Sequence, residues 1–252
     1  MLVDLAAEQD ELDAVVSVLG DDEWGTATPA DGWDVRDSVA HLAYSEELAT
    51  LALTDTTRFQ EILDDPSTAV AAWTEAGRTL SGLEVLRWWQ TTRGRTIAAL
   101  GARAERDRVP WAAGPMSAVS FATARLMETW AHGQDVRDAL GLPPSETDRL
   151  RHVADLGVRT RPFSYRLRGL EPPTVPVRVE LVHDGDRWTW DDGEAGEDVV
   201  RGTALDFCLV VTQRRHPSDT DLTVEGEHAR QWMSIAQAFA GPPTGPRERS
   251  PA

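Results

Sequence analysis

The sequence predicts a mostly α-helical protein, in which a four-helix bundle over residues 1–160 precedes a smaller α+β domain. Two observations support this fold class. Up to about residue 160, apolar residues recur three and four positions apart, the spacing of amphipathic helices. Beyond that point, prolines gather over 170–176, and apolar residues then alternate with polar ones, as is typical of strands. A chain of 252 residues is long enough for two such domains.

The predicted bundle has four principal helices. Their ranges are 2–19, 35–53, about 83–103 and 116–140. Asp34 can cap the second helix, because an aspartate side chain accepts hydrogen bonds from first-turn amides. Gly141 can end the fourth, because glycine adopts the left-handed conformation and two prolines follow it. The section 56–81, interrupted at Pro66, supplies one or two short helices, and a further helix over 146–156 completes the bundle.

The second domain is predicted to cover 161–242, and 243–252 is predicted to be a disordered tail rich in glycine, proline and arginine. Val177, Val179 and Leu181 alternate with other residues ahead of an Asp-Gly-Asp turn, which predicts a hairpin with a second strand ending at Trp190. The elements expected after it are a turn over 191–198, a helix over 203–213, a strand over 222–224 and a last helix over 227–239.

The charge of the chain argues against two classes of partner. The chain has 25 basic and 42 acidic residues, a formal net charge of −17, so nucleic acids and anionic membranes would repel it. No apolar run approaches the roughly 20 residues that span a bilayer. The N-terminal segment is acidic, whereas a signal peptide begins with basic residues. We therefore expect a cytoplasmic protein that acts on a small molecule.

Two residue types limit the chemistry. The sequence contains no lysine, which excludes Schiff-base catalysis by a lysine amine. The single cysteine, Cys208, lies in the apolar run 204–211 and is expected to be a small buried hydrophobe. Thiol chemistry would then need a thiol from outside the protein. Four histidines are expected at the surface: His152, His183, His216 and His228.

The most informative stretch is 125–135, within the fourth helix. Residues three and four apart share one face of a helix, so four ionisable side chains project together: Arg125, Glu128, His132 and Asp135. Apolar residues flank this face on both sides, so the charges lie in a mostly buried region and need partners. A carboxylate and an imidazole four residues apart can bind one metal ion.

A third ligand must come from another helix, and His41 on the second helix is our candidate. On its own, a histidine on such a polar stripe is more often half-exposed and hydrogen-bonded than a ligand.

The segment Gly32-Trp-Asp-Val-Arg-Asp-Ser-Val-Ala-His41-Leu, combined with Glu128-x-x-x-His132-x-x-Asp135, resembles the mycothiol-dependent maleylpyruvate isomerase family, whose N-terminal bundle is DinB-like. Within it, an actinobacterial subgroup of metal-binding proteins is the most similar. The resemblance extends over essentially the whole chain, because 204–208 and 236–243 look like the small domain of that subgroup, which is similar in fold to sterol carrier proteins.

The resemblance implies a zinc ion, or another divalent first-row metal, held by His41, Glu128 and His132, with Asp135 matching an active-site acid. It also implies mycothiol as the thiol cosubstrate. Two histidines and one glutamate leave a tetrahedral zinc with an open position, as in catalytic sites. The thiol of mycothiol would reach that position, add to a cis double bond, allow rotation and then leave, giving the trans isomer.

In that reaction, we expect Asp135 to supply a proton and Arg125 to anchor the substrate carboxylate. Each residue has an alternative role: Arg125 could form an intrahelical ion pair with Glu128, and Asp135 could orient His132. Two other functions also fit this site. One is a metal-dependent thiol S-transferase acting on electrophiles, and the other is a non-catalytic metal- or ligand-binding module.

Overall fold

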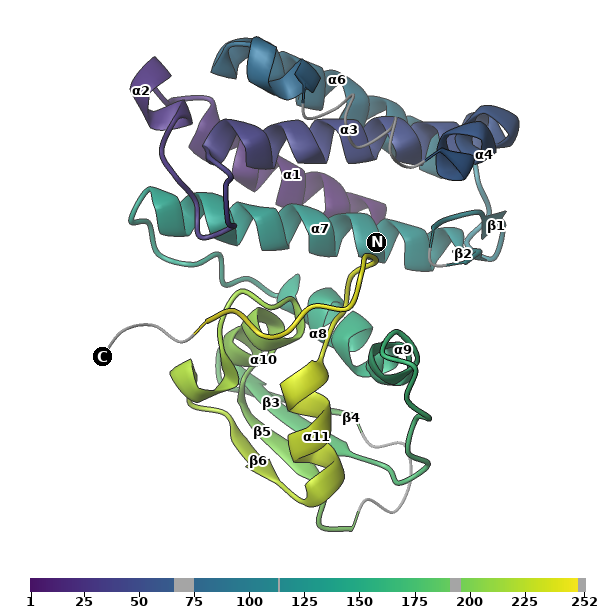
Figure 1. The fold of residues 1–252 in the computed structure, drawn as a ribbon, viewed down its shortest axis with the longest axis vertical. Coiled ribbons are helices and arrows are strands. Elements are labelled where there is room, and N and C mark those ends of the chain that lie inside the picture. The colour runs from purple at the N-terminus through teal and green to yellow at the C-terminus, as the bar shows by residue number, and fades with distance from the viewer. Residues whose placement is uncertain (66–74, 113, 191–195, 249–252) are drawn as a thin grey trace. The chain divides into compact units, whose positions relative to one another are not determined.

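The structure is a computed structural model that describes residues 1–65, 75–112, 114–190 and 196–248. The chain divides into two compact units, Met1–Ser145 and Glu146–Ala252. Figure 1 shows their elements in chain order. In the described part of the chain, no helix has both the length and the apolar character needed to cross a membrane.

The first unit is a bundle of four long helices, as the sequence predicts (Figure 1). These helices are α1 (Leu2–Val16), α3 (Val35–Thr54), α6 (Gly82–Gly101) and α7 (Ala118–Ala139). Both α1 and α3 pack against α6 and α7, which closes the bundle around one core. The shorter elements are α2 (Asp21–Trp24), α4 (Thr56–Asp64) and an antiparallel pair, β1 (Arg108–Val109) and β2 (Met116–Ser117).

Local capping fixes the start of α3 and the end of α7. The side chain of Asp34 accepts a hydrogen bond from the amide of Asp37 at 2.7 Å, so the predicted cap is confirmed. Gly141 has a φ of +65°, the left-handed conformation expected of a residue just beyond a helix end. Helix α7 begins slightly later than predicted, because Met116 and Ser117 pair with β1 instead of joining the helix.

Helix α7 is buried on most of its surface. Its flanks carry Leu126, Met127 and Trp130, all at most 1% exposed. Burying apolar side chains of this size contributes about 1.5–3 kcal/mol each. Several polar residues of α7, among them Arg125, Gln134 and Asp135, are buried as well, on a helix that packs against α3.

The second unit combines a four-stranded sheet with helices. The strands are β3 (Arg178–His183), β4 (Asp186–Trp190), β5 (Val199–Thr203) and β6 (Thr223–Glu225), in the order β4-β3-β5-β6. The predicted hairpin is β3 and β4, which pair antiparallel, whereas β5 lies parallel to β3 and was not predicted. The helices are α8 (Leu150–Arg159), α9 (Arg161–Arg166), α10 (Ala204–Val211) and α11 (Glu227–Ile235), with a 3-10 turn over Pro217–Asp219.

The division between the units falls earlier than the predicted boundary at 160. Helix α8 packs against α10 of the second unit instead of completing the bundle. The approach is close: a Cβ atom added at Gly157 would lie 2.7 Å from Cγ2 of Val211, so only glycine fits there without a shift. The boundary is therefore set by a contact between segments about 50 residues apart, which helical periodicity does not reveal.

Three further expectations differ from the structure. The last helix ends at Ile235, not near residue 239. Part of the predicted disordered tail is anchored, because the Thr244 hydroxyl lies 2.7 Å from Oε1 of Gln213. His183 is buried, not at the surface. Pro66 and most of the predicted turn over 191–198 lie outside the described residues.

The prediction for Cys208 is confirmed. Its side chain is fully buried on α10, and burial raises the pKa of the thiol well above its usual value. A thiol that stays protonated is a poor nucleophile, which agrees with the structural role expected of Cys208.

Candidate metal centre

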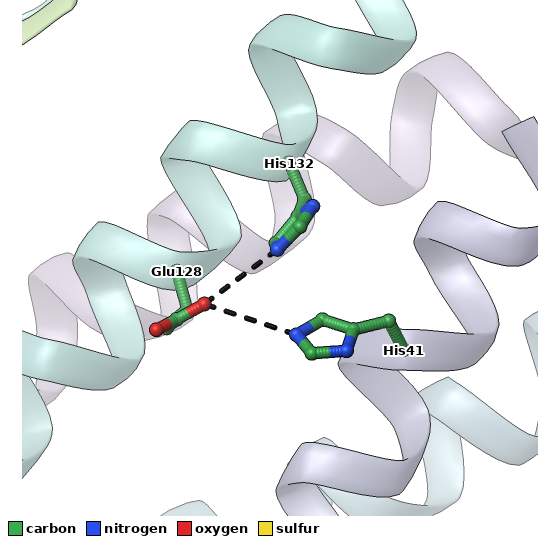
Figure 2. A group of neighbouring side chains, drawn as sticks. All are labelled: His41, Glu128 and His132. Carbon is green, nitrogen blue, oxygen red and sulfur yellow. Dashed lines mark ion pairs between the residues drawn. The ribbon is translucent and has the colours of Figure 1, made fainter. Parts of the chain in front are cut away.

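Helices α3 and α7 bring together the three side chains that the sequence singles out as metal ligands. His41 lies two turns into α3, after the Asp34 cap, while Glu128 and His132 lie one turn apart on α7. Figure 2 shows the carboxylate of Glu128 directed at both imidazoles. The convergence follows from the contact of α3 with α7 along the bundle.

The distances suit a shared cation. Oε2 of Glu128 lies 3.9 Å from Nε2 of His41 and 3.6 Å from Nε2 of His132. One ligand atom from each residue lies within 4.8 Å of the other two. With metal–ligand distances near 2.0–2.2 Å, two ligands of a tetrahedral zinc lie roughly 3.4 Å apart. The two distances from Glu128 are therefore within about half an ångström of the separation that a bound divalent ion requires.

Glu128 is held in its charged form. Burial by itself would raise the pKa of this carboxyl, but hydrogen bonding to His132 and His41 and the charge of Arg125 together bring it well below its ordinary value. A carboxylate that stays ionised is the form that binds a metal. The side chain of His41 is 28% exposed, so the cluster can be reached from solvent.

Trp33 is a part of this site that the sequence analysis missed as a functional residue. Its ring stacks on that of His132, with centroids 5.7 Å apart and planes 15° apart, and it lies 5.2 Å from the ring of His41. The two imidazoles are themselves 4.6 Å apart. Trp33 therefore packs against both candidate ligands and restricts their rotation. The feature of the sequence that could have identified Trp33 is its position next to Gly32, in the segment that leads to His41.

Arg125 is a buried cation, 2% exposed, that lies beside the candidate ligands. Its Nη1 donates a hydrogen bond to Oγ of Ser45 at 2.9 Å, and its guanidinium stacks over the ring of Trp111, 5.0 Å from the centroid. The intrahelical ion pair with Glu128 that we considered is present but long, at 4.0 Å. Ser45 and Trp111 thus fix the orientation of Arg125, and neither was singled out from the sequence.

Asp135 is fully buried behind His132. Its Oδ2 lies 3.6 Å from Nδ1 of His132, the ring nitrogen opposite the one that faces Glu128. This is the arrangement in which a carboxylate orients a ligating histidine and sets its tautomer.

Glu46 is a second buried carboxyl near the site, and the sequence analysis did not identify it. It is 1% exposed, and its Oε1 accepts a hydrogen bond from Nε2 of Gln9 at 3.2 Å. Burial raises the pKa of Glu46, although the charge of Arg125 opposes this effect. The site therefore holds two carboxyls with opposite pKa shifts, Glu46 and Glu128.

The chain is similar to known proteins over most of its length. Residues 5–137 match the model of the mycothiol maleylpyruvate isomerase N-terminal domain. Uncharacterized proteins from two strains of Mycobacterium tuberculosis are each 44% identical over 247 residues, which is 96% of this chain and 96% of each relative.

The fold is similar to the crystal structure of the mycothiol-dependent maleylpyruvate isomerase, with a TM-score of 0.60, 17% identity and coverage of 88% of this chain and 90% of that chain. A mutant of that isomerase gives a TM-score of 0.59 at the same identity and coverage. These matches confirm the resemblance that the segments around His41 and Glu128 suggested. The chain belongs to the mycothiol maleylpyruvate isomerase family.

Proposed function

We propose that this protein is a metal-dependent isomerase that uses mycothiol to convert a small cis-unsaturated acid of the maleylpyruvate type into its trans isomer. The metal is zinc or another divalent first-row ion bound by His41, Glu128 and His132. The observation that carries the proposal is the convergence of these donor atoms within 4.8 Å in a chain of this family.

When bound, zinc would favour the thiolate form of mycothiol, because the ion stabilises negative charge on sulfur. The chain's own residues hold the ligands in place. Trp33 packs against both imidazoles, and the Asp135 carboxylate contacts Nδ1 of His132 and so leaves Nε2 for the metal. Of the two roles that the sequence analysis considered for Asp135, we therefore assign it the positioning role and not that of the proton donor.

Arg125 is the proposed anchor for the substrate carboxylate. Its planar guanidinium is held by Ser45 and Trp111, so little conformational freedom is lost when a carboxylate binds. Because the contact between Arg125 and Glu128 is long, the guanidinium uses little of its hydrogen-bonding capacity on Glu128.

The reaction is balanced without an oxidant or a reductant. The thiol adds across the double bond: its sulfur bonds to one carbon, and a proton, equivalent to the one that the thiol gives up, bonds to the other. The resulting single bond rotates. Elimination then breaks the C–S bond and one C–H bond, which returns the thiol with its proton and gives the trans product.

The test is to measure the metal content of the purified protein and its turnover of maleylpyruvate with and without mycothiol. We expect trans product only when both metal and thiol are present, with no net loss of thiol. His132→Ala should abolish turnover and metal binding while the helical content persists. His228→Ala, a partly exposed histidine of the second unit, is the matched control and should retain both.

Two outcomes would replace the proposal by its alternatives. Accumulation of a stable thioether on simple electrophiles, with one thiol consumed per product, would identify a thiol S-transferase. Metal binding without any thiol-dependent product would identify a metal- or ligand-binding module.

A further inference from the structure

The side chain of His183, the last residue of β3, is buried and makes no hydrogen bond in the described part of the chain. Its side chain is only 1% exposed, yet neither Nδ1 nor Nε2 has a hydrogen-bond partner. An imidazole always has at least one N–H group to donate, and buried polar atoms are nearly always paired. The contacts of this imidazole with nearby carboxylates therefore lack hydrogen-bond geometry, as they would if the groups were arranged to share a ligand.

Carboxylates surround this imidazole. Nε2 lies 3.2 Å from Oδ1 of Asp148 and 3.9 Å from Oδ2 of Asp184, while Nδ1 lies 3.9 Å from Oε1 of Glu146. The side chains of Asp148 and Asp184 are 95% and 86% exposed. The group thus has a fixed inner donor, His183, and two outer donors that face solvent, through which an ion can enter.

The backbone places these groups within the second unit. Asp184 and Gly185 form the turn between β3 and β4 with φ angles of +47° and +84°, and they follow His183 directly. Asp148 lies two residues before α8. The His183 ring is held against Trp188, with centroids 5.0 Å apart. The strand, the turn and the start of the helix therefore bring the donors together from two separate segments.

We propose that Nε2 of His183 and the carboxylates of Asp148 and Asp184 form a second site for a divalent cation, separate from the centre in the bundle. One ligand atom from each lies within 4.8 Å of the others. An imidazole combined with carboxylates suits first-row ions such as Zn²⁺ or Mn²⁺, whereas Mg²⁺ and Ca²⁺ prefer oxygen ligands alone. The net charge of −17 also favours cation binding.

A cation at this position would link the β3–β4 turn to the segment that leads into α8. Its role is structural: two carboxylates that otherwise repel each other are neutralised, and two segments about 35 residues apart in sequence are cross-linked. Glu146 lies on the Nδ1 side of the ring and can accept the hydrogen bond that fixes the histidine tautomer when Nε2 binds the ion.

The test is calorimetric titration of the full chain with Zn²⁺ in a His41→Ala/His132→Ala background, in which the bundle centre is disabled. We expect one saturable equivalent of zinc. Adding Asp148→Asn and Asp184→Asn should weaken zinc binding by tenfold or more. Mutation of a residue that only hydrogen-bonds to a metal ligand already weakens metal binding by about 10–100-fold, and here two proposed ligands are changed. Both positions are exposed, so these changes should leave the circular dichroism spectrum unchanged.

Asp186→Asn is the matched control, because Asp186 is exposed at the start of β4, directly after the turn, and lies outside the cluster. Its zinc affinity should equal that of the background. Absence of a saturable equivalent in the background, or equal affinity in the Asp148→Asn/Asp184→Asn derivative, would overturn the proposal. The His41→Ala/His132→Ala background is replaced by the wild-type chain if it does not fold. In the wild-type chain, Asp148→Asn and Asp184→Asn together should lower the zinc stoichiometry by one equivalent. An unchanged stoichiometry would overturn the proposal. Because catalysis is not measured, the result is independent of the proposed function.

Discussion

Oδ2 of Asp135 lies 3.6 Å from Nδ1 of His132, on the opposite edge of the imidazole from the nitrogen that faces Glu128. Asp135 is fully buried, so its carboxylate meets His132 and not the solvent-facing side of the cluster. We therefore expect Asp135 to act on the candidate metal centre through the histidine, which gives the first prediction.

Asp135→Asn should weaken zinc binding by about 10–100-fold, because an amide orients and polarises the imidazole less well than a carboxylate. Turnover should recover at saturating zinc. Competition with a chromophoric chelator measures the affinity, and Asp138→Asn on the same helix serves as the control. Unchanged zinc affinity with turnover lost even at saturating zinc would instead make Asp135 the proton donor.

Arg125→Lys should lower kcat/KM for the unsaturated acid by about 10–100-fold, since hydrogen bonds to charged groups contribute about 1.5–3 kcal/mol. Lysine keeps the charge but loses the planar contacts with Trp111 and the paired donors. The KM for the acid should rise more than the KM for mycothiol in steady-state kinetics. Arg87→Lys, at an exposed position on α6, should behave as wild type. An equal rise in both KM values would argue against a carboxylate anchor.

Glu46→Gln should change how stability depends on pH. Burial raises the pKa of Glu46 in the folded state above the ordinary value of 4.5, so the folded protein holds this proton more tightly than the unfolded chain does. The free energy of unfolding of the wild type therefore falls as pH rises from about 4.5 through the folded pKa. Glutamine does not titrate, so this contribution is lost in the variant.

The stability of Glu46→Gln relative to the wild type should thus increase between pH 4.5 and pH 7. Urea unfolding at several pH values, with a chelator present, measures this difference. A stability difference that stays constant or decreases over this pH range would contradict a raised pKa of Glu46 in the folded protein.

Gly157→Ala should destabilise the second unit by about 1–3 kcal/mol, the range for overpacking a core. The added Cβ would lie 2.7 Å from Cγ2 of Val211 and 3.1 Å from Cε1 of Phe207. Gly94→Ala is the matched control, because a Cβ at this helical position meets nothing within 4 Å. The control should gain up to about 1 kcal/mol from helix propensity. Urea unfolding distinguishes the two, and equal stability would show that α8 can shift away from α10.

The sequence by itself determined the features that depend on local spacing. Apolar periodicity and capping residues such as Asp34 and Gly141 placed the four bundle helices, and the i, i+3 and i+4 rule placed Glu128, His132 and Asp135 on one face. His41 lies on a different helix, so spacing could not relate it to these residues, and its selection as the third ligand depended on the resemblance to a family for support.

Only the tertiary structure decided the features that depend on contacts between distant segments. These include the orientation of Arg125 by Ser45 and Trp111, the packing of Trp33 on both imidazoles, and the burial of His183 beneath Asp148. Strand β5 is a further example, because its pairing with β3 creates it. The division after Ser145 is another, because it follows from the packing of α8 on α10. Hydrophobic periodicity shows which face of an element is buried, whereas the partner of that face is chosen by side-chain packing across the folded chain.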